Sequence, residues 1–86
     1  MDDDNKMLNL ALDAGEIMLT SGAETYRVQD TMLRILSVSG RKQVEALALS
    51  TMLIVSLPRE EKGPLSMARG VKDRSVNFEK ICAVNN

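Results

Sequence analysis

The first part of the chain places apolar and polar residues with the period of a helix. At about 100° per residue, one narrow stripe between positions 6 and 20 is polar, and it holds Lys6, Asn9, Asp13, Glu16 and Thr20. Apolar residues fill an arc wide enough to be buried on more than one side. We therefore predict a helix over 6–20, after an unpatterned start that includes Asp2–Asp4. Gly15 lies on the apolar side, which indicates a close approach of another helix.

A second helix follows after a short corner. Thr20, Ser21 and Gly22 end the first helix, since glycine adopts the left-handed conformation that closes a helix. Ser21 and Glu24 also fit the capping box Ser-x-x-Glu, which predicts the start of the second helix. That helix runs to about Val38, so the two helices form an αα-hairpin or a sharp elbow.

The second helix separates an apolar side from a polar one. Thr25 belongs to the predicted apolar side, and Tyr26 is expected at its edge, half-buried with its hydroxyl at the rim. On the polar side, Asp30 is within reach of both Arg27 and Arg34. Such pairs contribute only tenths of a kcal/mol when they are exposed.

From position 41 onward the pattern is that of strands. Met52–Leu57 is a short run with β-branched residues that Pro58 ends, and it predicts a strand. The run 44–49 contains helix formers and is too short to decide by period, but a strand paired with Met52–Leu57 is favoured. Ser50 and Thr51 are poor residues for a tight hairpin, so we expect a wider or bulged loop.

The last segments complete the predicted fold. Residues 65–71 alternate as a third strand would, at an edge of the sheet, and a short C-terminal helix is expected to begin near Ser75 or Asn77. The fold class is α+β: an N-terminal helix hairpin packed on a small, mostly antiparallel sheet of two or three strands, with a short C-terminal helix. Residues 1–86 are expected to form a single domain.

The amino-acid composition excludes several classes of function. The net charge is −1, and the balance of acids and bases argues against a nucleic-acid partner. The sequence has no histidine, which excludes His-based zinc sites and Ser-His or Cys-His pairs, and its single cysteine, Cys82, excludes an intrachain disulfide. We predict no cofactor and no metal. The longest apolar stretch, 46–57, is short for a membrane span, so this chain by itself is expected to be soluble.

One group of polar residues is a candidate for chemistry. Glu24 and Asp30 could serve as acid and base, and Arg27 could hold a carboxylate. Spacing alone favours the alternative, a helix cap and a surface ion pair. A hydrolase-like module would use Glu24, Thr25 and Arg27, but the sequence identifies no further group that would activate a nucleophile, and it does not favour an enzyme.

A second polar group lies near the C-terminus. Arg69, Lys72 and Arg74 form a local basic patch, which is either solvated surface or a contact for lipid headgroups or an acidic partner.

Two runs of the sequence resemble the threonine/serine exporter family. The first is 10–32, with the core Ser-Gly-Ala-Glu-Thr-Tyr-Arg-Val, and the second is 69–85; the strand pair at 44–57 lies where the family has one. The motif positions carried over from the family are Ser21, Gly22, Glu24, Thr25, Arg27, Asp30, Arg74, Asn77 and Asn85. Gln29 departs from the family, which often has an acidic residue there, and this weakens a carboxylate-pair mechanism. Ser50-Thr51-Met52 replaces a turn that contains Pro or Gly.

The resemblance implies a role in export across a membrane. Such proteins have a soluble N-terminal domain at the cytoplasmic face and a multi-helix membrane part, sometimes on a separate subunit, that expels threonine, serine or related metabolites. No membrane helix lies within the 86 residues, so we expect a fragment, a truncated reading frame or a stand-alone domain.

The leading function is therefore the N-terminal domain of such a secondary transporter, acting in its assembly or gating. The expected partner is the membrane-embedded portion or a separate membrane subunit, and a second copy of the chain is left open. Two alternatives remain, the hydrolase-like module and a stand-alone interaction domain whose exposed apolar surface docks a partner.

Overall fold

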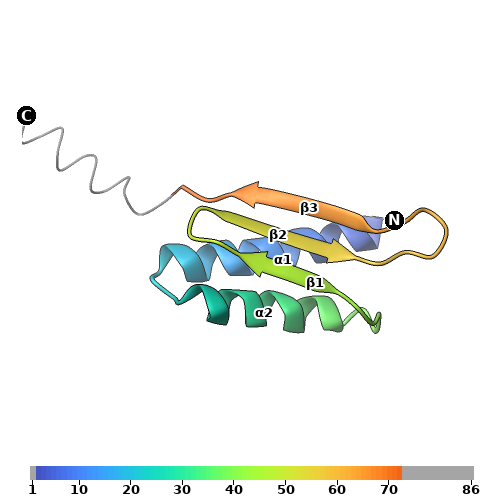
Figure 1. Ribbon diagram of the computed structural model, residues 1–86, viewed down its shortest axis with the longest axis horizontal. Helices are drawn as coiled ribbons and strands as arrows, with labels where there is room; N and C mark the ends of the chain where they lie inside the picture. The colour runs from blue at the N-terminus through green and yellow to red at the C-terminus, as the bar shows by residue number, and fades with distance from the viewer. Residues whose placement is uncertain (1, 73–86) are drawn as a thin grey trace, which may run out of the picture.

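Two helices cover one face of a three-stranded sheet (Figure 1). The computed structural model describes residues 2–72. The elements in chain order are α1 (Asp2–Thr20), α2 (Thr25–Ser37), β1 (Glu45–Ala48), β2 (Met52–Leu57) and β3 (Leu65–Gly70). The predicted α+β class, the helix pair and the antiparallel sheet are confirmed. The predicted C-terminal helix near Ser75 lies outside the described residues.

The sheet is antiparallel with the order β1-β2-β3, so β2 is its central strand. Successive side chains of a strand point to opposite faces, and Leu53, Val55 and Leu57 of β2 are the buried ones. They meet the apolar sides of both helices. The buried core consists of Leu8, Ala11, Leu12, Leu19, Val28, Met32, Leu36, Ala48, Leu53, Val55, Leu57 and Val71.

The first helix begins earlier than its pattern predicts, at Asp2 instead of Lys6. Acidic residues in a first helical turn are favourable because the helix dipole is positive there. Asp4 also pairs with Arg41, whose Nη2 lies 2.9 Å from the Asp4 Oδ1. This ion pair joins the start of α1 to the connection between α2 and β1.

Gly15 is the point of closest approach between α1 and its neighbours. A Cβ atom at this position would lie 2.7 Å from the Met32 sulfur of α2 and 3.0 Å from Cδ1 of Leu53 of β2. The predicted close approach of another helix is confirmed, and β2 approaches the same glycine.

The turn between β1 and β2 is tighter than predicted. Ala48 pairs with Leu53, and the Leu49 N–H donates to the Met52 carbonyl at 2.8 Å, so that Ser50 and Thr51 alone form the turn. The prediction of a wider or bulged loop is wrong. Neither turn residue has a positive φ, so the turn forms without the left-handed conformations that Ser and Thr disfavour.

Candidate functional site

The corner between α1 and α2 is closed by a glycine-based C-cap. Gly22 has φ 100°, and its N–H donates to the Leu19 carbonyl at 3.1 Å. The next N–H, that of Ala23, donates to the Met18 carbonyl at 3.0 Å. These two bonds are those of the Schellman motif, which satisfies carbonyls that the end of a helix leaves unpaired. The role predicted for Gly22 is confirmed.

The predicted capping box is wrong. The Ser21 N–H donates to the Ile17 carbonyl at 3.0 Å, so Ser21 still belongs to the last turn of α1 and cannot begin α2. Glu24 is itself the N-cap residue, with extended backbone at φ −66° and ψ 144°, and its side chain makes no capping hydrogen bond. The left-handed Gly22 lies between Ser21 and Glu24, so the pair does not share one helical start.

Three of the motif residues of the corner share a hollow with the chain that leaves the sheet. The hollow has a volume of about 280 Å³ and is lined by Gly22, Glu24 and Thr25, by Ser50 of the β1–β2 turn, and by Lys72. Val71, which also lines it, is fixed in place because its N–H donates to the Thr51 carbonyl at 2.8 Å. The corner, the turn and the exit of β3 therefore meet at one end of the molecule.

The polar side chains of the corner are exposed and unlinked. Glu24, Thr25 and Arg27 are all exposed, and within residues 2–72 no side-chain hydrogen bond joins them. Asp30 pairs with Arg34 at 3.0 Å, one turn further along, and no ion pair of the described residues includes Arg27. The hydrolase-like alternative thus gains no support from this geometry, because a nucleophile needs a base within hydrogen-bond reach.

Other residues of the motif lie differently from their predictions. Tyr26 is 67% exposed, so the prediction of a half-buried ring is wrong. The buried stripe of α2 consists only of Val28, Met32 and Leu36, and Thr25 is exposed as well. Arg74 and Asn77 lie outside the described residues.

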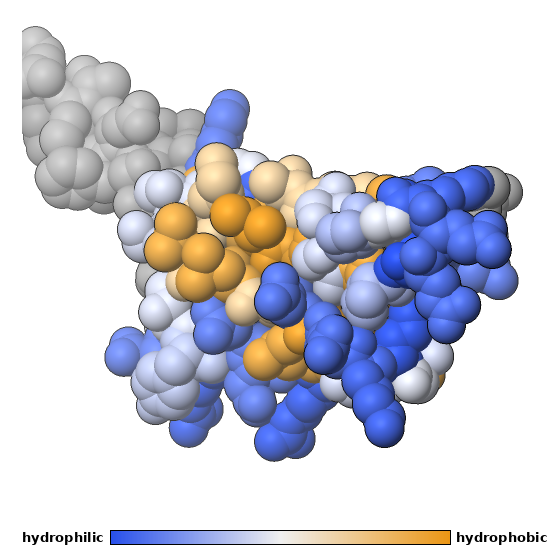
Figure 2. Space-filling view, turned by 45° about the vertical axis from the view of Figure 1, so that its right-hand side comes forward, coloured by the Kyte–Doolittle hydropathy of each residue, from blue (hydrophilic) through white to orange (hydrophobic). Residues whose placement is uncertain are grey.

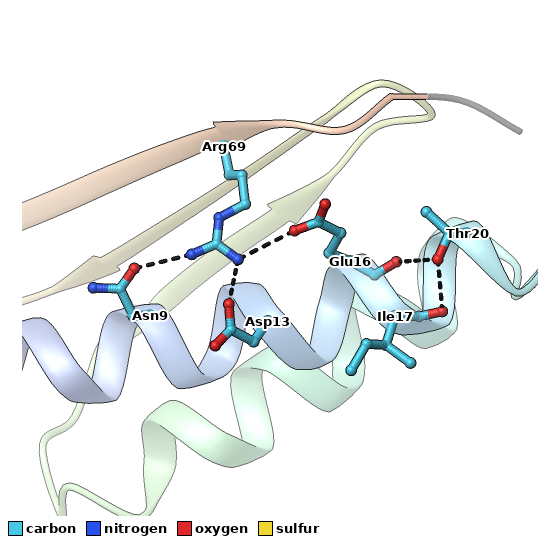
Figure 3. Close-up of polar contacts among 6 residues, drawn as sticks. All are labelled: Asn9, Asp13, Glu16, Ile17, Thr20 and Arg69. Carbon is cyan, nitrogen blue, oxygen red and sulfur yellow. Dashed lines mark hydrogen bonds and ion pairs between the residues drawn. The ribbon is translucent and has the colours of Figure 1, made fainter. Parts of the chain in front are cut away.

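A second polar cluster joins β3 to α1 (Figure 3). The Arg69 side chain extends from β3 over the helix, where its Nη1 donates to carboxylate oxygens of Asp13 and Glu16 and its Nη2 donates to Asn9 Oδ1 at 2.9 Å. The hydrogen bond that Arg69 donates to Asp13, opposed by burial, raises the pKa of the Arg69 guanidinium. Arg69 is therefore engaged within the fold, so it does not contribute a free charge to the predicted basic patch.

Removing this guanidinium should weaken the contact between β3 and α1. We expect Arg69→Gln to lower the free energy of unfolding by about 1 kcal/mol, because a partly buried arginine loses two carboxylate partners. Because the pKa of the guanidinium is raised, this contribution is lost at high pH only above the ordinary value of an arginine, so the effect should be constant between pH 6 and 9. Urea denaturation at these pH values measures it. Arg34→Gln, which breaks an exposed pair, is the control and should change stability by only tenths of a kcal/mol.

Comparison with known families identifies the chain. The sequence model of the threonine/serine exporters, ThrE, matches residues 9–86. The chain belongs to the threonine/serine exporter family. Searches of curated proteins and of solved structures found no match.

Two further findings bear on how this exporter-family chain is built. Among residues 2–72, neither helix has the length and apolar character that a membrane crossing requires. The same residues contain no cluster of acidic or cysteine side chains suited to hold a metal ion.

Gln29, where the exporter family often has an acidic residue, has a structural contact. Its Oε1 accepts a hydrogen bond at 3.1 Å from the backbone N–H of Ala48, on the edge of β1. The side chain thereby joins α2 to an edge strand whose outer N–H groups would otherwise lack a partner. No local pattern in the sequence indicates this contact, because Ala48 is 19 residues away from Gln29.

The left-handed backbone at Gly22 is expected to make any other residue less stable at this position. We expect Gly22→Ala to lower the free energy of unfolding by about 1 kcal/mol, because a Cβ atom is disfavoured at φ 100°. Gly70→Ala is the matched control, since nothing lies within 4 Å of its added Cβ and its φ is not in the left-handed region. Thermal denaturation of the two variants should show the loss at Gly22 only. Equal changes would mean that the corner tolerates a side chain.

Proposed function

We propose that this chain is the soluble N-terminal domain of a threonine/serine exporter-like secondary transporter and acts in its assembly or gating at the cytoplasmic face of the membrane. The observation that carries the proposal is the hollow at the corner, where Gly22, Glu24 and Thr25 lie beside Val71 and Lys72. The residues that resemble the family motif thus lie where the chain leaves its sheet.

The exposed side chains of the corner support a contact with a partner. Glu24 makes no capping bond and Arg27 no ion pair within the described residues, so the fold uses neither charge for its own stability. Exposed charges of opposite sign contribute to the specificity and rate of association with a complementary surface. The partner proposed is the membrane-embedded portion of the exporter, on the same polypeptide or on a separate subunit.

The corner is also placed to transmit a movement. The Thr51 carbonyl accepts the Val71 N–H, and Ser50 lines the hollow beside the start of α2. A partner that binds Glu24 and Arg27 would therefore lie next to the segment through which the domain continues. This arrangement suits gating as well as assembly.

Co-purification tests the proposal. The tagged chain is mixed with detergent-solubilised membranes that contain the membrane-embedded portion of the exporter, and the bound portion is quantified. We expect the double variant Glu24→Gln/Arg27→Gln to recover roughly tenfold less, which corresponds to about 1.4 kcal/mol. Arg34→Gln, on the same helix but away from the hollow, should recover as much as the parent.

Equal recovery with the double variant and the parent would contradict a contact through the corner. Circular dichroism of both variants checks that the substitutions do not unfold the chain. Because the substituted side chains are exposed, we expect the melting temperature to stay unchanged.

A further inference from the structure

The face of the sheet opposite the helices is apolar and, within residues 2–72, uncovered. Leu47, Ile54 and Ala68 lie in register across the three strands and form one row on this face. Leu49 and Met52 extend the row toward the β1–β2 turn, and Leu47 and Met52 are 44% and 39% exposed. We call these five residues the open sheet face. Figure 2 shows apolar side chains gathered on this side of the molecule, with hydrophilic ones around them.

One part of the open sheet face is also hollowed. An open groove of about 1090 Å³ is lined by Leu47 and Ile54 of this face and by Pro64 and Arg59. Covering such apolar side chains would stabilise the domain, because burying apolar surface contributes roughly 25 cal/mol per Å².

A second copy of the chain fits this face poorly. Three strands about 4.8 Å apart and four to six residues long present an area on the order of 300 Å². A stable interface between two proteins buries about 800 Å² on each partner. The face is thus too small to hold a dimer by itself, whereas a segment already joined to the domain needs less contact because its effective concentration is in the millimolar range.

The chain continues from the right place to supply that segment. Val71 is buried and bonded to Thr51, so residues 73–86 begin at the end of the sheet where Leu49 and Met52 lie. The other face is already occupied by α1 and α2. Fourteen residues extend about 21 Å as a helix or up to about 46 Å as an extended chain, and β2 is about 20 Å long. Either form is long enough to cross the open sheet face.

We propose that residues 73–86 pack on the open sheet face and complete the domain as a third layer, after the helices and the sheet. The segment has the apolar residues that such packing needs, namely Val76, Phe78, Ile81, Cys82 and Val84. The proposal concerns the fold of this chain alone and does not depend on the exporter function.

Cys82, the only cysteine of the chain, makes the proposal testable without a new probe site. A nitroxide attached to it broadens the NMR signals of nearby backbone amides in the ¹⁵N-labelled full chain. We expect the amides of Leu47, Ile54 and Ala68 to lose more than half of their intensity. The amides of Leu10 and Ile17, exposed on the far side of α1, should keep theirs.

Two companion measurements test whether the segment that broadens these signals belongs to the same chain or to a second copy. Ile54→Lys should restore the intensities of Leu47 and Ala68, whereas Ile17→Lys, an equal change at an exposed helical position, should not. The nitroxide-labelled ¹⁴N chain mixed with unlabelled ¹⁵N chain should leave all intensities unchanged. Broadening in this mixture would overturn the proposal in favour of a second copy, and undiminished intensities on the open sheet face of the singly labelled chain would overturn it outright.

Discussion

Gly15→Val is expected to lower the free energy of unfolding by about 2–3 kcal/mol. The first added atom would already lie 2.7 Å from the Met32 sulfur and 3.0 Å from Leu53, and the branched side chain adds two methyl groups there. Overpacking of a filled core costs about this much, because neighbours must leave their rotamers or the helices must move apart. Urea denaturation of the full chain, followed by circular dichroism, measures the change.

Two comparisons separate overpacking from helix propensity. Gly15→Ala should cost much less than Gly15→Val, because the flexible end of Met32 can move away and alanine favours the helix by about 1 kcal/mol. Leu10→Val, at an exposed position of the same helix, isolates the effect of branching and should change stability by only tenths of a kcal/mol. A Gly15→Val variant with the same free energy of unfolding as the parent would show that α1 does not pack as closely on α2 and β2 as described.

Leu53→Ala is expected to be the more damaging single change, with a loss of about 3–4 kcal/mol. Leu53 is fully buried on the central strand and contacts the glycine of α1, so its truncation leaves a cavity between the sheet and the helices. A domain of this size has a total stability of roughly 4–13 kcal/mol, so the variant would lose a large part of it.

Thermal and urea unfolding of Leu53→Ala and Leu10→Ala provide the matched test. Both variants delete the same atoms, but Leu10 is 57% exposed and its loss should stay within about 0.5 kcal/mol. Similar losses at the two positions would contradict the assignment of the core to the face of the sheet that carries the helices.

Periodicity predicted the helices because each of them buries one face, as the polar stripe of α1 shows. The strand Met52–Leu57 was predicted from its run of β-branched and other apolar residues before Pro58. The start of α1 was missed because Asp4 is held by Arg41, a contact across 37 residues that no local pattern contains.

The corner shows why a motif can be identified while its geometry is mistaken. Ser21 and Glu24 have the spacing of a capping box, but Gly22 between them is left-handed and leaves Ser21 at the C-terminal end of α1. Tyr26 was expected to be half-buried, yet α2 packs only along Val28, Met32 and Leu36, and the ring lies outside that stripe.

Arg69 shows the same limit for charges. Because Arg69 lies close to Lys72 in the sequence, the two indicated a basic patch. Alternate side chains of β3 point to opposite faces of the sheet, and this directs Arg69 toward α1, where Asp13 and Glu16 accept its hydrogen bonds. Its three partners, Asn9, Asp13 and Glu16, all come from the polar stripe of α1. Only the packing of the helix on the sheet brings them together.

The family match covers residues 9–86, which include the corner, and we propose that this domain acts on export through the corner. The most direct measurement is the rate of threonine efflux from cells that contain the membrane-embedded portion of the exporter, with or without this chain. We predict faster efflux with the parent chain, and with Glu24→Gln/Arg27→Gln a rate no higher than without any chain. An efflux rate that is the same in all three cases would contradict the account.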